Sequence, residues 1–135
     1  MSHDHVEAVR GVYERWSQGD FHAGPELYDD KVIFVMNPEF PDAGVYIGPR
    51  AIGGYMRGFL EPWSKLTIEA TEILPAGDTV FAAVTQCGEG SGSGAATELR
   101  YFHLWTFRGT RLIRLEAIRE RDDALTAAGL EGSEW

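Results

Sequence analysis

The chain has 135 residues, 44% of them hydrophobic and 24% charged, which suits a single domain built around one core. Its formal net charge of −9, without any run of Lys and Arg, argues against nucleic acid or an anionic membrane as a partner. The single cysteine, Cys87, excludes an internal disulfide and a Cys-rich metal site. Because the N-terminus has no apolar signal core and no window has the length of a membrane span, we expect a cytoplasmic protein.

The N-terminal half is expected to form three helices. In residues 5–18 apolar side chains recur at three- and four-residue steps, which predicts a helix with one buried stripe: Val6, Val9, Tyr13 and Trp16. Pro25 favours the start of a short second helix over residues 25–28. Residues 49–63 begin with proline and predict a third helix, whose apolar stripe is Ile52, Tyr55, Met56, Phe59, Leu60 and Trp63.

Strand patterns dominate the rest of the chain. The run KVIFVM (31–36) predicts a buried strand that ends at Asn37-Pro38, and two further strands are expected over 65–74 and 79–87. The intervening segment 37–48 is expected to be irregular, either as a lid over a cavity or packed on the core. Asp122 is expected to cap a final short helix that runs through Ala128.

Residues 98–120 predict a β-hairpin, because two apolar runs flank the polar sequence Arg108-Gly109-Thr110-Arg111. A two-residue turn would place His103 opposite Glu116. A three-residue turn would place His103 opposite Leu115, Trp105 opposite Ile113 and Tyr101 opposite Ala117. We favour the second register because it separates apolar from charged residues better. It predicts an inner face with Leu99, Tyr101, His103, Trp105, Phe107, Ile113, Leu115, Ala117 and Arg119.

The order of elements, with GVYERWSQGD, LYDDKVIFVMNPEF, FPDAGVYIGPRAI and FHLWTFRGTRLIRLEAI, resembles the SnoaL-like branch of the nuclear transport factor 2-like (ketosteroid isomerase-like) superfamily. The resemblance covers nearly the whole chain, with a core of about residues 5–130 in one domain spanning 1–135. It implies an α+β fold in which a strongly curved, mostly antiparallel sheet forms a cone around the three helices of the N-terminal half, a cystatin-like roll. It also implies a deep apolar pocket and a homodimer formed through the outer sheet face, where Phe102, Leu104 and Ile118 are expected.

Two specific activities found among such proteins are not expected here. Ketosteroid isomerases use an aspartate before a proline as their base, whereas Asn37 precedes Pro38 in this chain. They place a protonated aspartate where this chain has His103, and a tyrosine within a residue of Tyr13. Limonene epoxide hydrolases need an aspartate at the position of Ala117. Cyclase-like chemistry stays open, because it requires mainly one inward base and a shaped apolar cavity.

His103 is the main candidate for catalysis, as a base or as a hydrogen-bond donor to a carbonyl group, because burial favours its neutral form. The alternative is a core histidine bonded to backbone or to Asn37. Arg119 either contacts a ligand at the cavity mouth or forms an ordinary salt bridge. Asn37 either orients a ligand carbonyl or caps its own turn. An aromatic pocket wall or a solid aromatic core is expected from Tyr13, Trp16, Tyr55, Trp63, Tyr101 and Trp105.

Two functional hypotheses follow. The first is a small-molecule-binding domain that, if it is an enzyme, performs cofactor-free acid/base chemistry of the cyclase or isomerase type on a hydrophobic carbonyl compound. The second is a non-catalytic binding or dimerisation module. No cofactor is expected, and no metal site is inferred because His3, His5 and His22 lack matched spacing.

Overall fold

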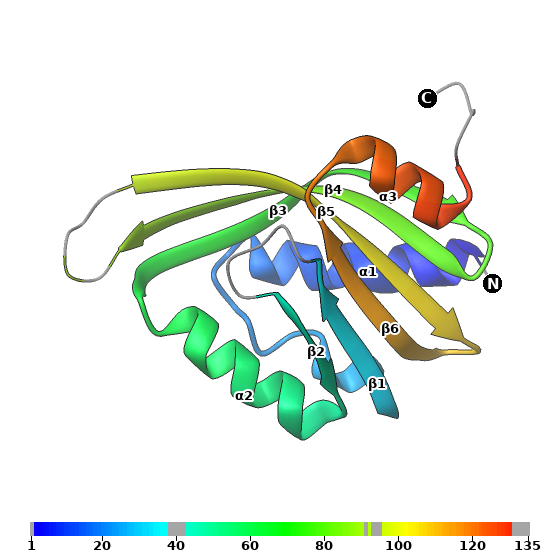
Figure 1. Ribbon diagram of the computed structural model, residues 1–135, viewed down its shortest axis with the longest axis horizontal. Coiled ribbons are helices and arrows are strands. Elements are labelled where there is room, and N and C mark those ends of the chain that lie inside the picture. The colour runs from blue at the N-terminus through cyan, green and yellow to red at the C-terminus, as the bar shows by residue number, and fades with distance from the viewer. Residues whose placement is uncertain (1, 38–42, 91, 93–95, 131–135) are drawn as a thin grey trace.

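The computed structural model describes residues 2–37, 43–90, 92 and 96–130. Helices and a mixed sheet form separate layers, which confirms the expected α+β class (Figure 1). The elements in chain order are α1 (Ser2–Trp16), the 3-10 helix η1 (Pro25–Leu27), β1 (Tyr28–Met36), β2 (Gly44–Ile47), α2 (Pro49–Leu60), β3 (Trp63–Ala76), β4 (Thr79–Gly90), β5 (Ala96–Arg108), β6 (Arg111–Ile118) and α3 (Arg121–Ala128).

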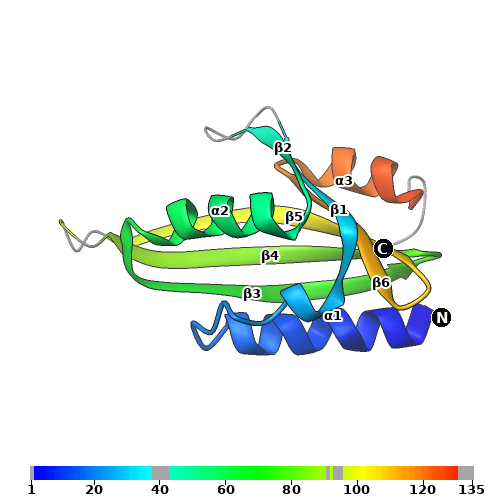
Figure 2. The same ribbon diagram turned by 90° about the horizontal axis from the view of Figure 1, so that it is seen from below.

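The described strands form one sheet in the order β2-β1-β6-β5-β4-β3. All neighbouring strands are antiparallel except β1 and β6, which run parallel. The long strands β3, β4 and β5 curve across the molecule (Figure 1). Helix α1 packs along β3 and β4, whereas α2 contacts β1 and β2 (Figure 2). The two helices and the concave side of the sheet therefore enclose the region in which the candidate site lies.

Strand β2 was not predicted, because its four residues, GVYI, lie in a segment interrupted by prolines. It pairs with the edge of β1, for example Ile47 opposite Ile33, and this pairing supplies backbone partners that the sequence pattern does not reveal. Tyr46 packs against Phe34 and Tyr55, as in the core-packing alternative for this segment. The lid alternative falls largely on residues 38–42, which lie outside the described residues.

Helix α1 buries the predicted stripe. Val6, Val9, Tyr13 and Trp16 are all buried, and Val12 joins them. These positions follow the three- and four-residue spacing that places side chains on one helical face. Helix α1 is therefore fixed against the sheet by its apolar side chains, and it carries Tyr13 and Trp16 toward the concave face.

Helix α2 is shorter than predicted. It ends at Leu60, since Pro62 lacks the backbone N–H that a further helical turn requires. Trp63, assigned by sequence to the helical stripe, instead begins β3 and lies over Gly88, where an added Cβ would come within 2.5 Å of the indole. Of the α2 stripe only Ile52 is buried, whereas its other members are partly exposed.

The β5–β6 pairing matches neither predicted register. His103 lies opposite Ala117, and Trp105 lies opposite Leu115. Next to the turn the strands follow the two-residue connection Gly109-Thr110, with Gly109 at a φ of +61°. Farther along the hairpin, odd-numbered residues face odd-numbered ones, as in the three-residue register. His103 therefore keeps its predicted inner face although its partner is different.

A β-bulge explains how a two-residue turn and the pairing of odd-numbered residues farther along occur in the same hairpin. The register shifts between Thr106 and Phe107, and Ile113 is the extra residue on β6. Leu112 consequently lies opposite Phe107 and is fully buried in the inner core, whereas the prediction placed Leu112 on the outer face and Ile113 on the inner one. A bulge changes the facing of every residue between it and the turn, which explains why the error is confined to the end of the hairpin.

Helix α3 covers part of the opposite sheet face. Leu104 and Ile118 pack there with Phe81, and their exposed fractions are 4% and 2%. Phe102 packs at the edge of this cluster, and the guanidinium of Arg121 lies 6.0 Å from its ring centroid. Two of the three residues expected at a dimer interface are thus already buried within one chain. The homodimer itself stays a prediction.

Helix α3 begins two residues earlier than expected. Glu120, and not Asp122, is the residue before its first turn, so both Asp122 and Asp123 lie inside that turn. Their negative charges still complement the positive end of the helix dipole. Gly129 ends the helix with a φ of +79°, a left-handed conformation that suits glycine. No helix in the described residues combines the length and apolar character needed to cross a membrane.

Candidate functional site

A cavity of about 530 Å³ lies between the concave side of the sheet and the helices. Its volume is within the usual range for sites that hold small molecules. Its inner wall consists of residues from β1, β3, β4, β5 and β6, and α2 forms the wall facing them. The partly exposed stripe of α2 is explained by this space, because Tyr55, Met56, Phe59 and Leu60 all line the cavity.

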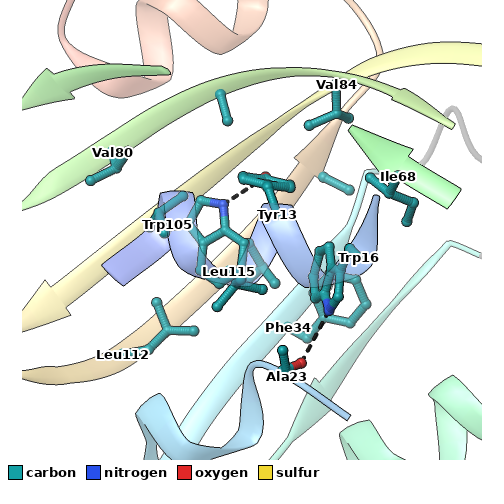
Figure 3. Packing of buried hydrophobic residues seen from close by; sticks show 14 of the residues in the cluster. Tyr13, Trp16, Ala23, Phe34, Ile68, Val80, Val84, Trp105, Leu112 and Leu115 are labelled. Atoms are coloured by element: carbon teal, nitrogen blue, oxygen red, sulfur yellow. Dashed lines mark hydrogen bonds between the residues drawn. The ribbon is translucent and has the colours of Figure 1, made fainter. Parts of the chain in front are cut away.

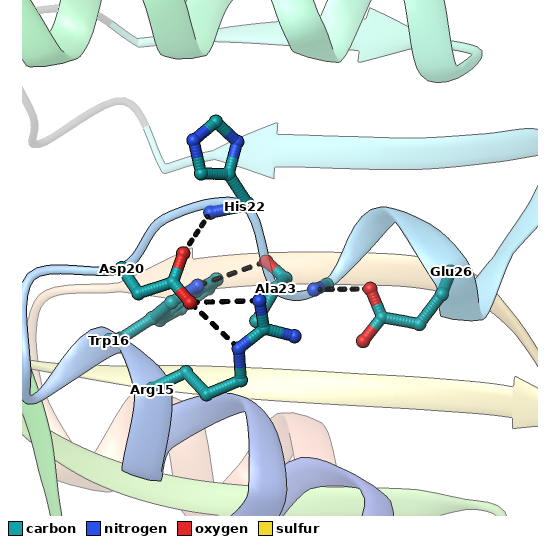
Figure 4. Close-up of polar contacts among 7 residues, drawn as sticks. Arg15, Trp16, Asp20, His22, Ala23 and Glu26 are labelled. Atoms are coloured by element: carbon teal, nitrogen blue, oxygen red, sulfur yellow. Dashed lines mark hydrogen bonds and ion pairs between the residues drawn. The ribbon is translucent and has the colours of Figure 1, made fainter.

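The cavity reaches the surface between residues 19–25 and α2. Its exposed lining residues lie in these two segments: Gly19, His22, Pro25, Pro49 and Arg57. Side-chain contacts fold the 19–25 segment against α1 (Figure 4). Arg15 binds the Asp20 carboxylate, which also accepts a hydrogen bond from the His22 backbone, and the Trp16 indole donates to Ala23 O at 3.1 Å. These contacts shape one side of the cavity mouth.

His103 lies on the cavity wall and is connected to α1 by a chain of hydrogen bonds. Trp105 Nε1 lies 2.8 Å from the Tyr13 hydroxyl (Figure 3). The same hydroxyl lies 2.7 Å from His103 Nδ1. All three side chains are buried. Tyr13 and His103 are 90 positions apart in sequence, so the contact depends on α1 packing across the sheet.

The donor and acceptor roles in this chain follow from chemistry. An indole N–H can only donate, so Trp105 donates to the Tyr13 oxygen. The Tyr13 hydrogen then has one acceptor among the described residues, His103 Nδ1. The reverse arrangement would leave that hydrogen buried without a partner, which is costly. Because Nδ1 accepts, the proton of neutral His103 is on Nε2.

The protonation states agree with this assignment. Burial raises the pKa of Tyr13 well above its usual value, despite the opposing hydrogen bond from Trp105, so the hydroxyl keeps its proton. Burial lowers the pKa of His103 to about 3, because the charged imidazolium would lose its hydration. His103 is therefore neutral at pH 7. This agrees with the neutral form expected from burial, and its role as a base or a hydrogen-bond donor stays a prediction.

His103 Nε2 has no hydrogen-bond partner in the described part of the chain, and it is not among the side-chain atoms buried without one. The Nε2–H group is thus a donor on the wall of the cavity. Gln86 of β4 is a second buried polar residue on this wall, and its Oε1 accepts a hydrogen bond from the Tyr101 hydroxyl at 2.8 Å. A few polar groups in an otherwise apolar wall can orient a ligand.

The structure brings together some of the residues proposed from sequence and separates others. His103, Trp16, Tyr55 and Tyr101 line the cavity. Tyr13 and Trp105 do not line the cavity. Their polar atoms form the hydrogen-bond chain with His103. The remaining proposed contacts also lie outside the lining: Asn37, Trp63 and Arg119.

Each of these three residues has a different local reason for its position. Asn37 follows the last residue of β1, where its backbone N–H donates to Ala117 O. Trp63 packs on Gly88 instead of facing α2. Arg119 lies beyond the end of β6, where its guanidinium donates to Arg100 O at 2.8 Å, and no salt bridge of Arg119 is found among the described residues.

Sequence reasoning missed Gln86 and Arg57, the two other polar residues considered below. Gln86 could have been found, because it follows Val80, Ala82 and Val84 on the inward-facing positions of β4. Arg57 gave no comparable signal, since an arginine on the exposed side of a helical stripe is ordinary. Among the described residues, no three His, Cys, Asp or Glu side chains are grouped closely enough to hold a metal ion.

The sequence matches the family model of the SnoaL-like domain over residues 9–115, which is most of the chain. The protein belongs to the SnoaL-like domain family. The match extends from the middle of α1 into β6 and so includes β1 to β5, part of β6, α2 and both ends of the Tyr13–His103 contact. A comparison with curated proteins finds no match.

Solved structures confirm the ketosteroid isomerase-like fold of this SnoaL-like domain. An NTF2-like protein from Burkholderia thailandensis E264 is 22% identical, with a TM-score of 0.74 over 93% of this chain and 95% of that one. A hypothetical protein from Catenulispora acidiphila DSM 44928, in complex with trimethylamine, is 17% identical, with a TM-score of 0.72 over 96% and 97%. TerC, co-crystallised with polyporic acid, is 19% identical, with a TM-score of 0.71 over 92% and 97%. At these identities the likeness establishes the fold alone.

Proposed function

We propose that this SnoaL-like domain binds a hydrophobic carbonyl compound in its cavity, with His103 Nε2–H donating a hydrogen bond to the carbonyl oxygen. The observation that carries the proposal is the Tyr13–His103 contact, which leaves the outward ring nitrogen protonated and facing the cavity. A carbonyl oxygen is the matching acceptor. The apolar and aromatic walls would hold the rest of the molecule.

The same donor favours a second, catalytic form of this function. A fixed N–H group in a largely apolar site stabilises negative charge that develops on a carbonyl oxygen, as when water or hydroxide from the solvent removes an α-proton to give an enolate. In that case His103 acts as the oxyanion donor, because a pKa of about 3 makes it a poor base at pH 7. No Asp or Glu lines the cavity within the described residues, so the cavity wall there offers no carboxylate base either.

The ligands bound to the two relatives do not identify a substrate for this protein. One protein of this fold was crystallised with trimethylamine and another with polyporic acid, which shows that each of those proteins accommodates a small organic molecule. We therefore take from them support for a small-molecule partner of this chain, and we base the choice of a carbonyl compound on His103.

Binding can be tested with benzophenone and diphenylmethane, two probes of similar shape that differ in the carbonyl group. Isothermal titration calorimetry should show tighter binding of the ketone by about five- to hundredfold, the range expected for one hydrogen bond to a buried partner. His103→Phe should remove this preference, whereas His22→Asn, at the exposed mouth, should retain it. Equal affinity of the wild-type protein for both probes would overturn the proposal.

A separate experiment distinguishes catalysis from binding. A bound ketone that carries α-hydrogens, such as 1-tetralone, should exchange them with deuterium from the solvent faster in the presence of the protein if the site stabilises an enolate. NMR follows the loss of the α-proton signal. Binding without accelerated exchange would assign the protein to the non-catalytic alternative, and exchange that is unchanged in His103→Phe would exclude the oxyanion role.

A further inference from the structure

The charges around the cavity differ from those of the rest of the protein. The chain contains 21 acidic residues and has a net charge of −9, yet no Asp or Glu lines the cavity among the residues that the structure describes. The one lining side chain with a permanent charge there is Arg57, on α2 at the exposed mouth. The one permanent charge among the described lining residues is therefore positive, on a protein that is acidic as a whole.

The Arg57 side chain lies beside two glycines one turn earlier in α2. A Cβ atom on Gly53 would lie 3.8 Å from Arg57 Nη1, and one on Gly54 would lie 3.7 Å from Nη2. The guanidinium thus lies back along the helix, over a stretch without side chains, which is the direction expected for a long helical side chain. Gly53 also lines the cavity, so this position keeps the guanidinium beside the opening.

Arg57 differs from most arginines of the chain in having no counter-charge. Within the described residues its guanidinium has no ion-pair or hydrogen-bond partner, whereas six other arginines bind carboxylates: Arg10, Arg15, Arg100, Arg108, Arg114 and Arg121. The planar guanidinium is suited to bind a carboxylate through two parallel hydrogen bonds. A cation next to an apolar cavity also attracts anions locally, although the protein as a whole repels them.

We propose that the compound bound in the cavity is an acid, with an anionic carboxylate held by Arg57 at the mouth and a carbonyl oxygen held by His103 on the wall. This inference rests on the proposed function and narrows it from hydrophobic carbonyl compounds to keto acids with an aromatic or polycyclic body. The two polar contacts belong to different walls of the cavity, α2 and β5, so a single ligand would span it.

The test compares 4-benzoylbenzoate with the uncharged 4-benzoylbenzamide, which has nearly the same shape and the same ketone. Calorimetry at low ionic strength should show that the wild-type protein binds the acid at least about fivefold more tightly, and added salt should reduce the difference. Arg57→Gln should remove the preference without changing the affinity for the amide, which shows that the cavity is intact.

Arg50→Gln is the matched control. Arg50 is also exposed on α2 and has no ion pair in the described residues, but it does not line the cavity. This variant should keep the preference for the acid. The inference would be overturned if Arg57→Gln kept the preference for the acid, or if Arg57→Gln and Arg50→Gln lost that preference equally.

The same titrations separate this inference from the proposed function. His103→Phe should weaken both probes by a similar factor, because both carry the ketone. If His103→Phe weakens both probes but the wild-type protein binds acid and amide equally, the proposed function stands and the role of Arg57 is wrong. If neither probe binds, or His103→Phe affects neither, the proposed function fails and the inference fails with it.

Discussion

Two buried histidines in this protein use opposite ring nitrogens. His5 of α1 donates from Nε2 to Gly109 O at 2.7 Å and stacks on Phe107, with ring centroids 4.4 Å apart. Its Nδ1 is buried without a partner. His103 accepts at Nδ1 from Tyr13 and directs Nε2–H into the cavity. The exposed fractions of the two residues are similar, 6% and 4%.

The comparison shows that burial alone does not mark a functional histidine. The free nitrogen of His5 is enclosed by protein and can reach no ligand, so His5 serves to fix the hairpin turn against α1. His103 lines the cavity, and its free nitrogen is not among the atoms buried without a partner. What distinguishes the two is therefore the surroundings of the second nitrogen, and the predictions below test this difference.

The largest expected effect is on the pH dependence of stability. The pKa of His103 is about 3 in the folded protein and about 6.5 in an unfolded chain. Between these values the unfolded state binds more protons. The contribution of His103 to the free energy of unfolding is therefore fully present above about pH 6.5. It decreases by about 1.4 kcal/mol for each pH unit as the pH falls toward 3.

Urea unfolding at a series of pH values checks this prediction, with His103→Phe as the comparison. Both proteins contain the same carboxylates, so their acidic residues contribute alike, and the difference between the two curves isolates His103. The wild-type free energy of unfolding should fall more steeply below pH 6.5 than that of the variant. Parallel curves would mean that His103 is hydrated or paired in the folded state.

A smaller loss of stability is expected from Tyr13→Phe. The substitution removes the hydroxyl that joins Trp105 and His103 and leaves two buried nitrogens without their partner, at a cost of about 1–3 kcal/mol. Tyr28→Phe is the control, because no hydrogen bond of its hydroxyl is found in the described residues. We expect the control to change the free energy of unfolding by less than about 0.5 kcal/mol. Similar values for both variants in thermal or urea unfolding would contradict the hydrogen-bond chain.

The local sequence patterns predicted which face His103 occupies, but they predicted neither the bulge in β6 nor the cavity. The apolar stripe of α1 and the alternation along β5 correctly placed His103 on the inner face, because both patterns are local. The bulge at Ile113 could not be predicted, since an extra residue in a strand has no distinctive local pattern. The cavity was equally hidden, because the apolar stripe of α2 has the same pattern whether it packs on a sheet or faces a space.

The partners of individual polar groups were the least predictable part. The Tyr13–His103 bond joins α1 to β5 and depends on the packing of the whole sheet between them. Arg119 was assigned to the inner face by extending the parity of β6 beyond its last residue, where regular alternation no longer holds. Local patterns predict which face a residue occupies, whereas the contact it makes depends on distant elements.

The smallest expected effect is that of His5→Phe. A phenyl ring keeps the stack on Phe107 and removes both the bond to Gly109 O and the unpaired buried nitrogen, so we expect a change within about 1 kcal/mol. The affinity for benzophenone should be the same as in the wild-type protein. A large loss of affinity would show that the two histidines are coupled and would weaken the contrast between them.

The most direct test of the central claim is the ¹⁵N NMR spectrum of the His103 ring, assigned by comparison with His103→Phe. We predict a proton on Nε2, a bare Nδ1, and no titration between pH 8 and about pH 4. Addition of a bound ketone should shift the Nε2 signal. A proton on Nδ1, or titration of the ring near pH 6.5, would contradict the assignment of His103 as a fixed donor to the cavity.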